Sequence, residues 1–75
     1  PKQLARSCNF EPEILSRVII GQLNAMQQEY HLQILESLPQ SKGSAFVRLN
    51  LSGCAIQENR LIGILEKMPN LQELD

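Results

Sequence analysis

Two hydrophobic periods follow one another in the C-terminal half of the chain. Leu49 and Leu51 alternate with polar residues, which predicts a strand over residues 48–51 with both leucines on its buried face. Residues 60–68 then carry apolar side chains three or four positions apart, which predicts a helix between a capping Asn59 and Pro69. The apolar residues we expect to be buried are Leu49, Leu51, Ile56, Leu61, Leu65 and Leu71.

This strand–helix pattern is part of an internal repeat. The segment "NAMQQEYHLQILESLP" (24–39) aligns with "CAIQENRLIGILEKMP" (54–69), and both end in a predicted helix. The apolar blocks that follow them, "FVRLNL" and "LQELD", repeat at a shorter interval. The extra residues of the first copy form the polar stretch 40–45, which predicts a surface insertion loop.

The repeat resembles a known family. Its apolar positions follow L-x-x-L-x-L-x-x-C-x-I and then begin again: Phe46, Leu49, Leu51, Cys54, Ile56, then Leu71 and Leu74. This pattern resembles the leucine-rich repeat, especially its cysteine-containing and ribonuclease-inhibitor-like subclasses. The resemblance implies an α/β fold, namely a solenoid fragment with short parallel strands, one helix per repeat and a helical N-terminal cap. Because such arrays need about three units, we expect an N-terminal segment of a longer array.

The resemblance also divides the chain. Residues 46–70 would be one complete repeat and residues 71–75 the start of the next. Residues 1–45 would be either a helical N-terminal cap or a degenerate first repeat that includes the insertion loop.

The stretch 12–28 admits both of these interpretations. As a helix, it would be capped by Asn9 and would carry Pro12 in its first turn. As a degenerate repeat, its strand would be residues 18–20, which are β-branched and favour a strand. Gly21 would then occupy a leucine position, so the helix is the favoured prediction.

The composition offers little for catalysis or cofactor binding. The net charge is −1 and the basic residues are scattered, which argues against nucleic acid, and no apolar run is long enough for a membrane span. No motif places a serine or cysteine beside His31, and Cys8 and Cys54 are not at a metal-binding spacing. We therefore expect a cytoplasmic protein with reduced thiols, no metal, no cofactor and no enzymatic activity.

Strand positions that face away from the core are the candidate binding residues: Arg48, Asn50, Ser52, Glu73 and Asp75. By resemblance they would lie on the concave face of the repeat array, where partner proteins usually dock. The function implied is a non-catalytic protein–protein interaction scaffold. Alternatively, Arg48 and Glu73 lie beside one another on adjacent strands and simply pair in a solvated surface.

Two alternative functions remain open. The segment "EPEILSRVI" (11–19) resembles the start of an F-box, which would make the chain a substrate-recognition or adaptor part of a ubiquitin ligase. The sequence departs from that motif because Phe10-Glu11-Pro12 replaces its Leu-Pro and the chain has no tryptophan. The other alternative is a GTPase-activating or inhibitor-type repeat regulator.

The C-terminal end of the repeat predicts self-association. An uncovered strand edge and an apolar helix flank both favour contacts with further chains. The side chains we expect to make these contacts are Ile64, Met68, Leu71 and Leu74.

Overall fold

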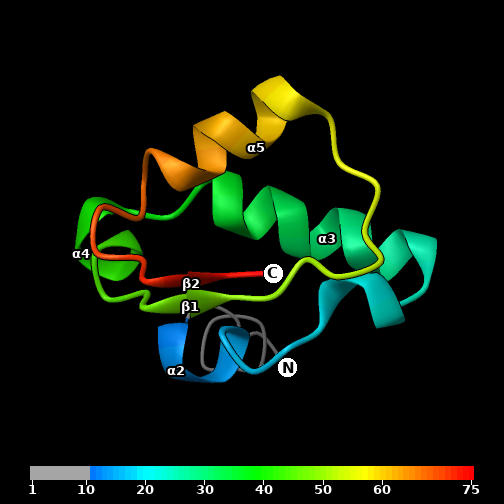
Figure 1. Cartoon of the computed structure of the whole chain (residues 1–75), viewed down its shortest axis with the longest axis horizontal. Coiled ribbons are helices and arrows are strands. Elements are labelled where there is room, and N and C mark those ends of the chain that lie inside the picture. Colours follow the sequence, from blue (N-terminus) through cyan, green and yellow to red (C-terminus); the bar gives the residue numbers. More distant parts are fainter. Residues whose placement is uncertain (1–10) are drawn as a thin grey trace, which may run out of the picture.

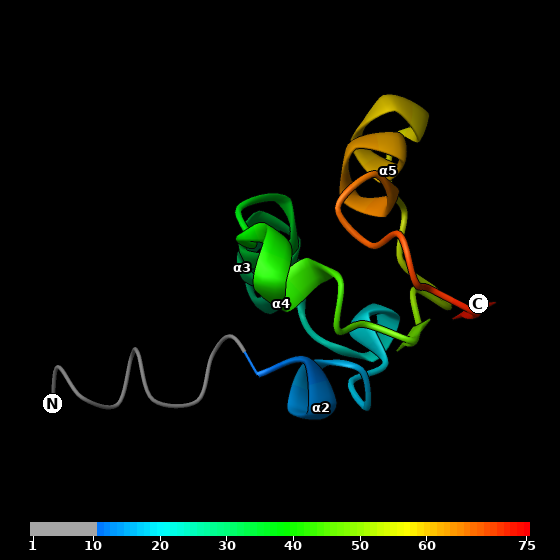
Figure 2. The same cartoon turned by 90° about the vertical axis from the view of Figure 1, so that its left-hand side faces the viewer.

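The computed structural model describes residues 11–75. Its elements, in chain order, are α2 (Pro12–Leu15), the 3-10 helix η1 (Ile20–Gln22), α3 (Ala25–Glu36), α4 (Gln40–Gly43), β1 (Arg48–Leu49), α5 (Glu58–Leu65) and β2 (Glu73–Leu74). Helices α3 and α5 lie on one side of the strand pair and α2 lies on the other (Figures 1 and 2).

Strands β1 and β2 pair in parallel. Arg48 lies opposite Glu73 and Leu49 lies opposite Leu74, which confirms the register predicted from the repeat. Helix α5 forms the crossover that parallel neighbours require. On the other side of β1, Ile19 forms an isolated parallel bridge with Asn50.

The predicted fold class, an α/β leucine-rich-repeat solenoid fragment, is wrong. Residues 11–75 are mostly helical, their two parallel strands have two residues each, and no solenoid is found in them. The hydrogen bonds between the strands extend to Leu51, whose N–H donates to Asp75 O at 3.1 Å. The chain then turns: Ser52 N donates to the Asn50 side chain at 2.9 Å, and Gly53 adopts a φ of 80°, which a side chain would disfavour.

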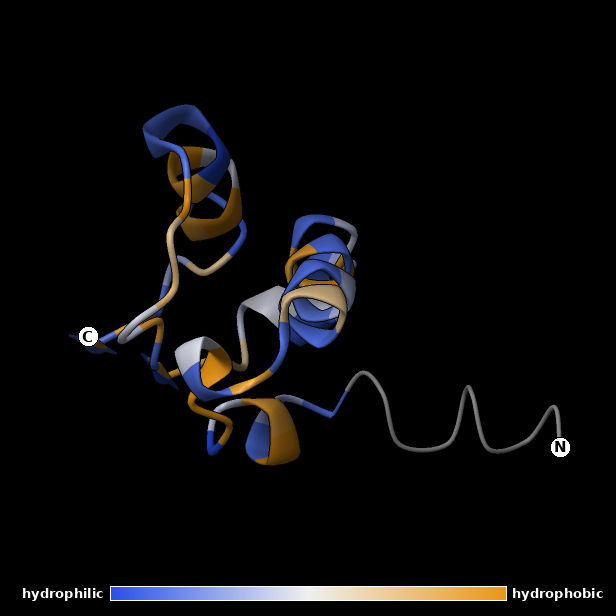
Figure 3. Cartoon of the chain, turned by 90° about the vertical axis from the view of Figure 1, so that its right-hand side faces the viewer, coloured by the Kyte–Doolittle hydropathy of each residue, from blue (hydrophilic) through white to orange (hydrophobic). Residues whose placement is uncertain are grey.

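The two longer helices lie near their predicted positions. Helix α3 confirms the helix expected in the segment 24–39, and the Asn24 side chain caps it by accepting a hydrogen bond from Gln27 N at 2.8 Å. Helix α5 begins at Glu58 rather than after Asn59, because the chain leaves its extended conformation at Gln57. Figure 3 shows the hydrophilic start and the hydrophobic remainder of α5.

The core gathers between these helices and the strands. The largest fully buried side chains are Phe46, Ile20, Leu35, Leu49 and Ile64. Leu49 and Leu51 are buried as predicted, whereas four other predicted core residues are only partly buried: Ile56, Leu61, Leu65 and Leu71. Two residues expected to mediate self-association, Ile64 and Met68, are buried within the chain and cannot contribute contacts to another copy.

The favoured helix over residues 12–28 is not formed. Helix α2 ends at Leu15, the chain becomes extended at Ile19, and Ile20 N donates to Asn50 O at 3.2 Å. The strand alternative was therefore closer, although it contributes a single bridge. The proposed Asn9 cap and Cys8 lie outside the described residues.

Gly21 permits this arrangement. A Cβ atom at Gly21 would lie 1.8 Å from Ser52 O and 2.5 Å from the carbonyl carbon of Gly53. A leucine at this position, as the repeat pattern would have it, is therefore excluded by backbone contact.

The insertion at 40–45 is also more ordered than predicted. It contains α4, and Gly43 is buried against Lys67, where a Cβ atom would lie 2.0 Å from the carbonyl oxygen of Lys67. Lys42 Nζ lies 3.1 Å from Glu11 Oε2, so the insertion also contacts the segment before α2.

An ion-pair network joins α3 to α5. Arg60 Nε donates to Glu36 Oε2 at 2.7 Å, and the two terminal nitrogens of Arg60 donate to Glu29 at 3.0 and 2.7 Å. The hydrogen bonds from Arg60, with a further one from Gln33, hold the pKa of Glu29 below its usual value of 4.5. The hydrogen bonds to Glu29 and Glu36 raise the pKa of Arg60.

We expect Arg60→Met to lower the free energy of unfolding and to weaken its pH dependence. A carboxyl whose pKa is depressed by folding stabilises the fold above its unfolded pKa, and this contribution is lost as the pH falls through the folded value. The stability difference between wild type and variant should therefore shrink as the pH falls below 4.5. Urea unfolding at several pH values measures it.

Arg17→Met is the matched control. Arg17 pairs with Glu13 at 3.2 Å, but both side chains are mostly exposed, so the change should be within about 0.5 kcal/mol. Equal effects of the two substitutions would contradict the role of Arg60.

Candidate functional site

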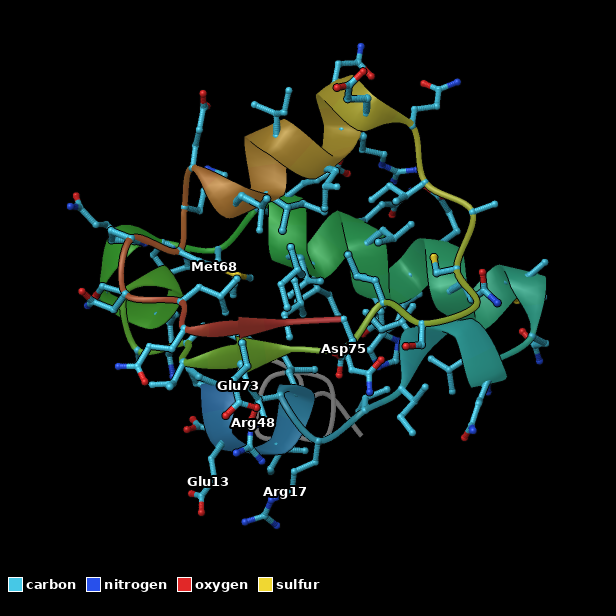
Figure 4. All side chains as sticks on the ribbon, in the orientation of Figure 1. Glu13, Arg17, Arg48, Met68, Glu73 and Asp75 are labelled. Carbon is cyan, nitrogen blue, oxygen red and sulfur yellow. The ribbon has the colours of Figure 1, made fainter. Side chains whose placement is uncertain are left out.

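The candidate site is the side of the strand pair that faces away from α3 and α5, which we call the outer sheet face. Because side chains alternate along a strand, burial of Leu49 turns Arg48 and Asn50 to the opposite side. Figure 4 shows Arg48 and Glu73 on the outer sheet face and the buried Met68 on the helix side of the strands.

A pocket of about 400 Å³ lies on the outer sheet face. Its polar lining residues are Ser16, Arg17, Arg48, Asn50, Glu73 and Asp75, and its apolar ones are Ile19 and Leu49. The structure thus brings together four of the five predicted binding residues. Ser52 does not line the pocket, because it lies in the exposed turn after Asn50.

Arg48 and Glu73 pair across the strands but remain accessible. Arg48 Nε lies 3.4 Å from Glu73 Oε1, and the two side chains are 61% and 64% exposed. A pair this exposed contributes less than about 1 kcal/mol to folding. The geometry therefore fits both expectations from the sequence: Arg48 pairs with Glu73, and both side chains stay accessible to a partner.

Arg17 and Ser16 are the polar pocket residues that the sequence interpretation missed. They follow α2 directly, where the chain turns back toward the strands. Figure 4 shows Arg17 and Glu13 on the same side of the strands as Arg48 and Glu73. The predicted helix over residues 12–28 would continue past Arg17 instead of turning back toward the strands, so that prediction could not place Arg17 beside Arg48. No local motif indicates the turn.

A second pocket of about 460 Å³ adjoins the first. The two share Ser16, Arg17 and Arg48, and the second is also lined by the exposed Val47. Arg17 and Arg48 therefore stand between a polar pocket and one with an accessible apolar side chain. This combination offers ion pairing, hydrogen bonding and a small apolar contact to a ligand.

The residues considered for catalysis lie elsewhere. His31 Nδ1 lies 3.0 Å from Gln27 O on α3, and the His31 ring meets Tyr30 edge-on at 6.0 Å. Cys54 is a partly buried free thiol that packs against the core. Across residues 11–75, no group of three histidine, cysteine or acidic side chains is placed to hold a metal ion.

Comparisons with protein-family models, with curated proteins and with solved structures found no match for the chain. The leucine-rich-repeat and F-box resemblances of the sequence therefore stay predictions. Within the part of the chain that the structure describes, every helix is too short or too polar to cross a membrane.

Proposed function

We propose that the chain is a non-catalytic interaction module whose outer sheet face binds another protein in the cytoplasm, without a cofactor. The observation that supports this most strongly is the convergence of Arg48, Asn50, Glu73 and Asp75 with Arg17 around one pocket. These residues come from three separate segments of the chain, so the fold is what assembles them.

The electrostatics of the pocket suit a protein ligand. Two guanidinium groups and two carboxylates line it, and a surface with both signs of charge selects a partner by complementary charge rather than by net attraction. Arginine is also enriched among residues that dominate binding energy, because its planar group makes several directed hydrogen bonds.

The exposure of the pocket residues also supports the proposal. Arg17, Arg48 and Glu73 are mostly exposed, so their contribution to stability is small and their side chains are accessible to a partner.

Peptide display provides a test. Peptides selected on the immobilised 75-residue chain should bind Arg48→Glu at least about tenfold more weakly, as expected for a central arginine of an interface. Lys67→Glu is the matched control, because it makes the same charge change outside the pocket and should leave the affinity unchanged. Equal losses for both variants, or no loss for Arg48→Glu, would contradict the proposed site.

A further inference from the structure

The second pocket, of about 460 Å³, has accessible apolar surface. Pro12 of α2 lines it, together with Ala45 and Val47 from the chain that leads into β1. Ala45 is exposed and Val47 is 47% exposed, so these side chains are in contact with solvent. Covering such a surface is favourable roughly in proportion to the apolar area removed from water.

The polar side chains that α2 contributes to the second pocket are bonded to one another. Arg17 Nη2 donates to Glu13 Oε2 at 3.2 Å, and Ser16 Oγ donates to the backbone oxygen of Glu13 at 3.0 Å. Figure 4 shows Arg17 and Glu13 projecting together below the strands. Neither charge of this pair is left over for a ligand.

The other two charged side chains of the pocket lining are paired as well. Arg48 Nε lies 3.4 Å from Glu73 Oε1, and Glu11 Oε2 lies 3.1 Å from Lys42 Nζ. Among the described residues that line the second pocket, each acidic or basic side chain therefore already faces an opposite charge.

This pairing decides which ligand group the second pocket favours. A charged group from a ligand would have to displace one of the existing pairs, and the displaced side chain would lose its own partner. The net gain is small, because one exposed ion pair is exchanged for another. An apolar group that covers Pro12, Ala45 and Val47 needs no such exchange.

We propose that the second pocket holds an apolar side chain of the partner protein, of about the size of leucine, with the paired charges as a polar rim around it. Apolar anchors that fill a pocket inside a ring of energetically near-neutral contacts dominate many protein interfaces. The inference rests on the proposed function, because the second pocket shares Ser16, Arg17 and Arg48 with the pocket on the outer sheet face.

Capped amino acids test the inference directly. In a nuclear magnetic resonance titration of the ¹⁵N-labelled 75-residue chain, we expect N-acetyl-leucine methylamide to shift the amides of Ser16, Ala45 and Val47 with millimolar affinity, as a ligand of this size allows. The lysine and glutamate analogues should bind at least about tenfold more weakly. Added salt should leave the affinity for the leucine analogue unchanged, because no ion pair forms.

Ala45→Leu should fill the pocket from within the chain. We expect it to weaken binding of the leucine analogue at least about tenfold, because the added side chain takes the space of the ligand. Ala55→Leu is the matched control, since Ala55 is also exposed but does not line the pocket. An unchanged melting temperature would show that each variant folds.

Val47→Thr tests the apolar contact without changing the volume of the side chain. It replaces one methyl group by a hydroxyl group, and we expect about fourfold weaker binding of the leucine analogue, the factor carried by one buried carbon group. Ile62→Thr on α5 is the matched control, because Ile62 is 49% exposed and lies outside the pocket.

Each contrary outcome is distinct. The inference is wrong if the lysine or glutamate analogue binds as tightly as the leucine analogue, or if Ala45→Leu and Ala55→Leu bind it equally well. A dimer in light scattering that Ala45→Leu abolishes would make a second copy the occupant and would also overturn it. If the leucine analogue does not bind but Arg48→Glu still weakens the selected peptides, the inference fails and the proposed function stands.

Discussion

Gly21→Ala should strongly lower the free energy of unfolding. Its Cβ atom would lie 1.8 Å from Ser52 O and 2.7 Å from Cys54 N, and these backbone atoms cannot rotate away as a side chain could. Overpacking of this kind costs about 3 kcal/mol or more. A chain of this length has a total stability of roughly 4 to 11 kcal/mol, so the loss should be plain in a urea unfolding curve.

Gly63→Ala is the matched control for this prediction. A Cβ atom at Gly63 would meet nothing within 4 Å, and the residue lies inside α5. Alanine is the better helix former, so this substitution should stabilise the chain by about 0.5 to 1 kcal/mol. A Gly21→Ala variant as stable as the wild type would show that the first segment does not pack against the turn at residues 52–54.

Leu49→Ala should destabilise the chain by about 2 to 5 kcal/mol, because removing a buried leucine loses its burial and leaves a cavity. Leu49 is 2% exposed and belongs to the main core cluster. Its register partner Leu74 is 45% exposed, so Leu74→Ala should cost less than about 1 kcal/mol. Urea unfolding monitored by circular dichroism measures both. Similar losses would contradict the assignment of β2 as the exposed strand.

The sequence predicted what depends on short-range periodicity. Alternation of Leu49 and Leu51 with polar residues identified the buried face of β1, and the internal repeat predicted the pairing of Arg48 with Glu73. The alignment that carried this register also suggested a solenoid, which the described residues do not form. A repeated pattern fixes which residues lie opposite one another, but it does not set how far the strands extend before a turn ends them.

Tertiary contacts decided the features that the sequence did not predict. The end of α2 at Leu15 accompanies the close approach of Gly21 to the turn at residues 52–54, which no local pattern encodes. Arg60 forms ion pairs with Glu36 and Glu29, which lie 24 and 31 positions before it in the sequence. Their ion pairs form because α3 and α5 pack together.

The residues of the candidate site also fall into those that periodicity predicts and those that tertiary contacts place. Alternation and the internal repeat identified five outward-facing residues, Arg48, Asn50, Ser52, Glu73 and Asp75, and the resemblance suggested that they bind a partner. The structure places all of them except Ser52 around one pocket. Arg17 entered the site only because the chain turns after α2.

The most direct test of the outer sheet face as a docking site is a nuclear magnetic resonance titration of the ¹⁵N-labelled chain with a peptide selected on it. We expect the largest amide shift changes to fall on Arg17, Arg48, Asn50, Glu73 and Asp75, while the amides on the exposed face of α3 around Tyr30 do not shift. Changes concentrated on α3 or α4, with the amides of β1 and β2 unaffected, would contradict it.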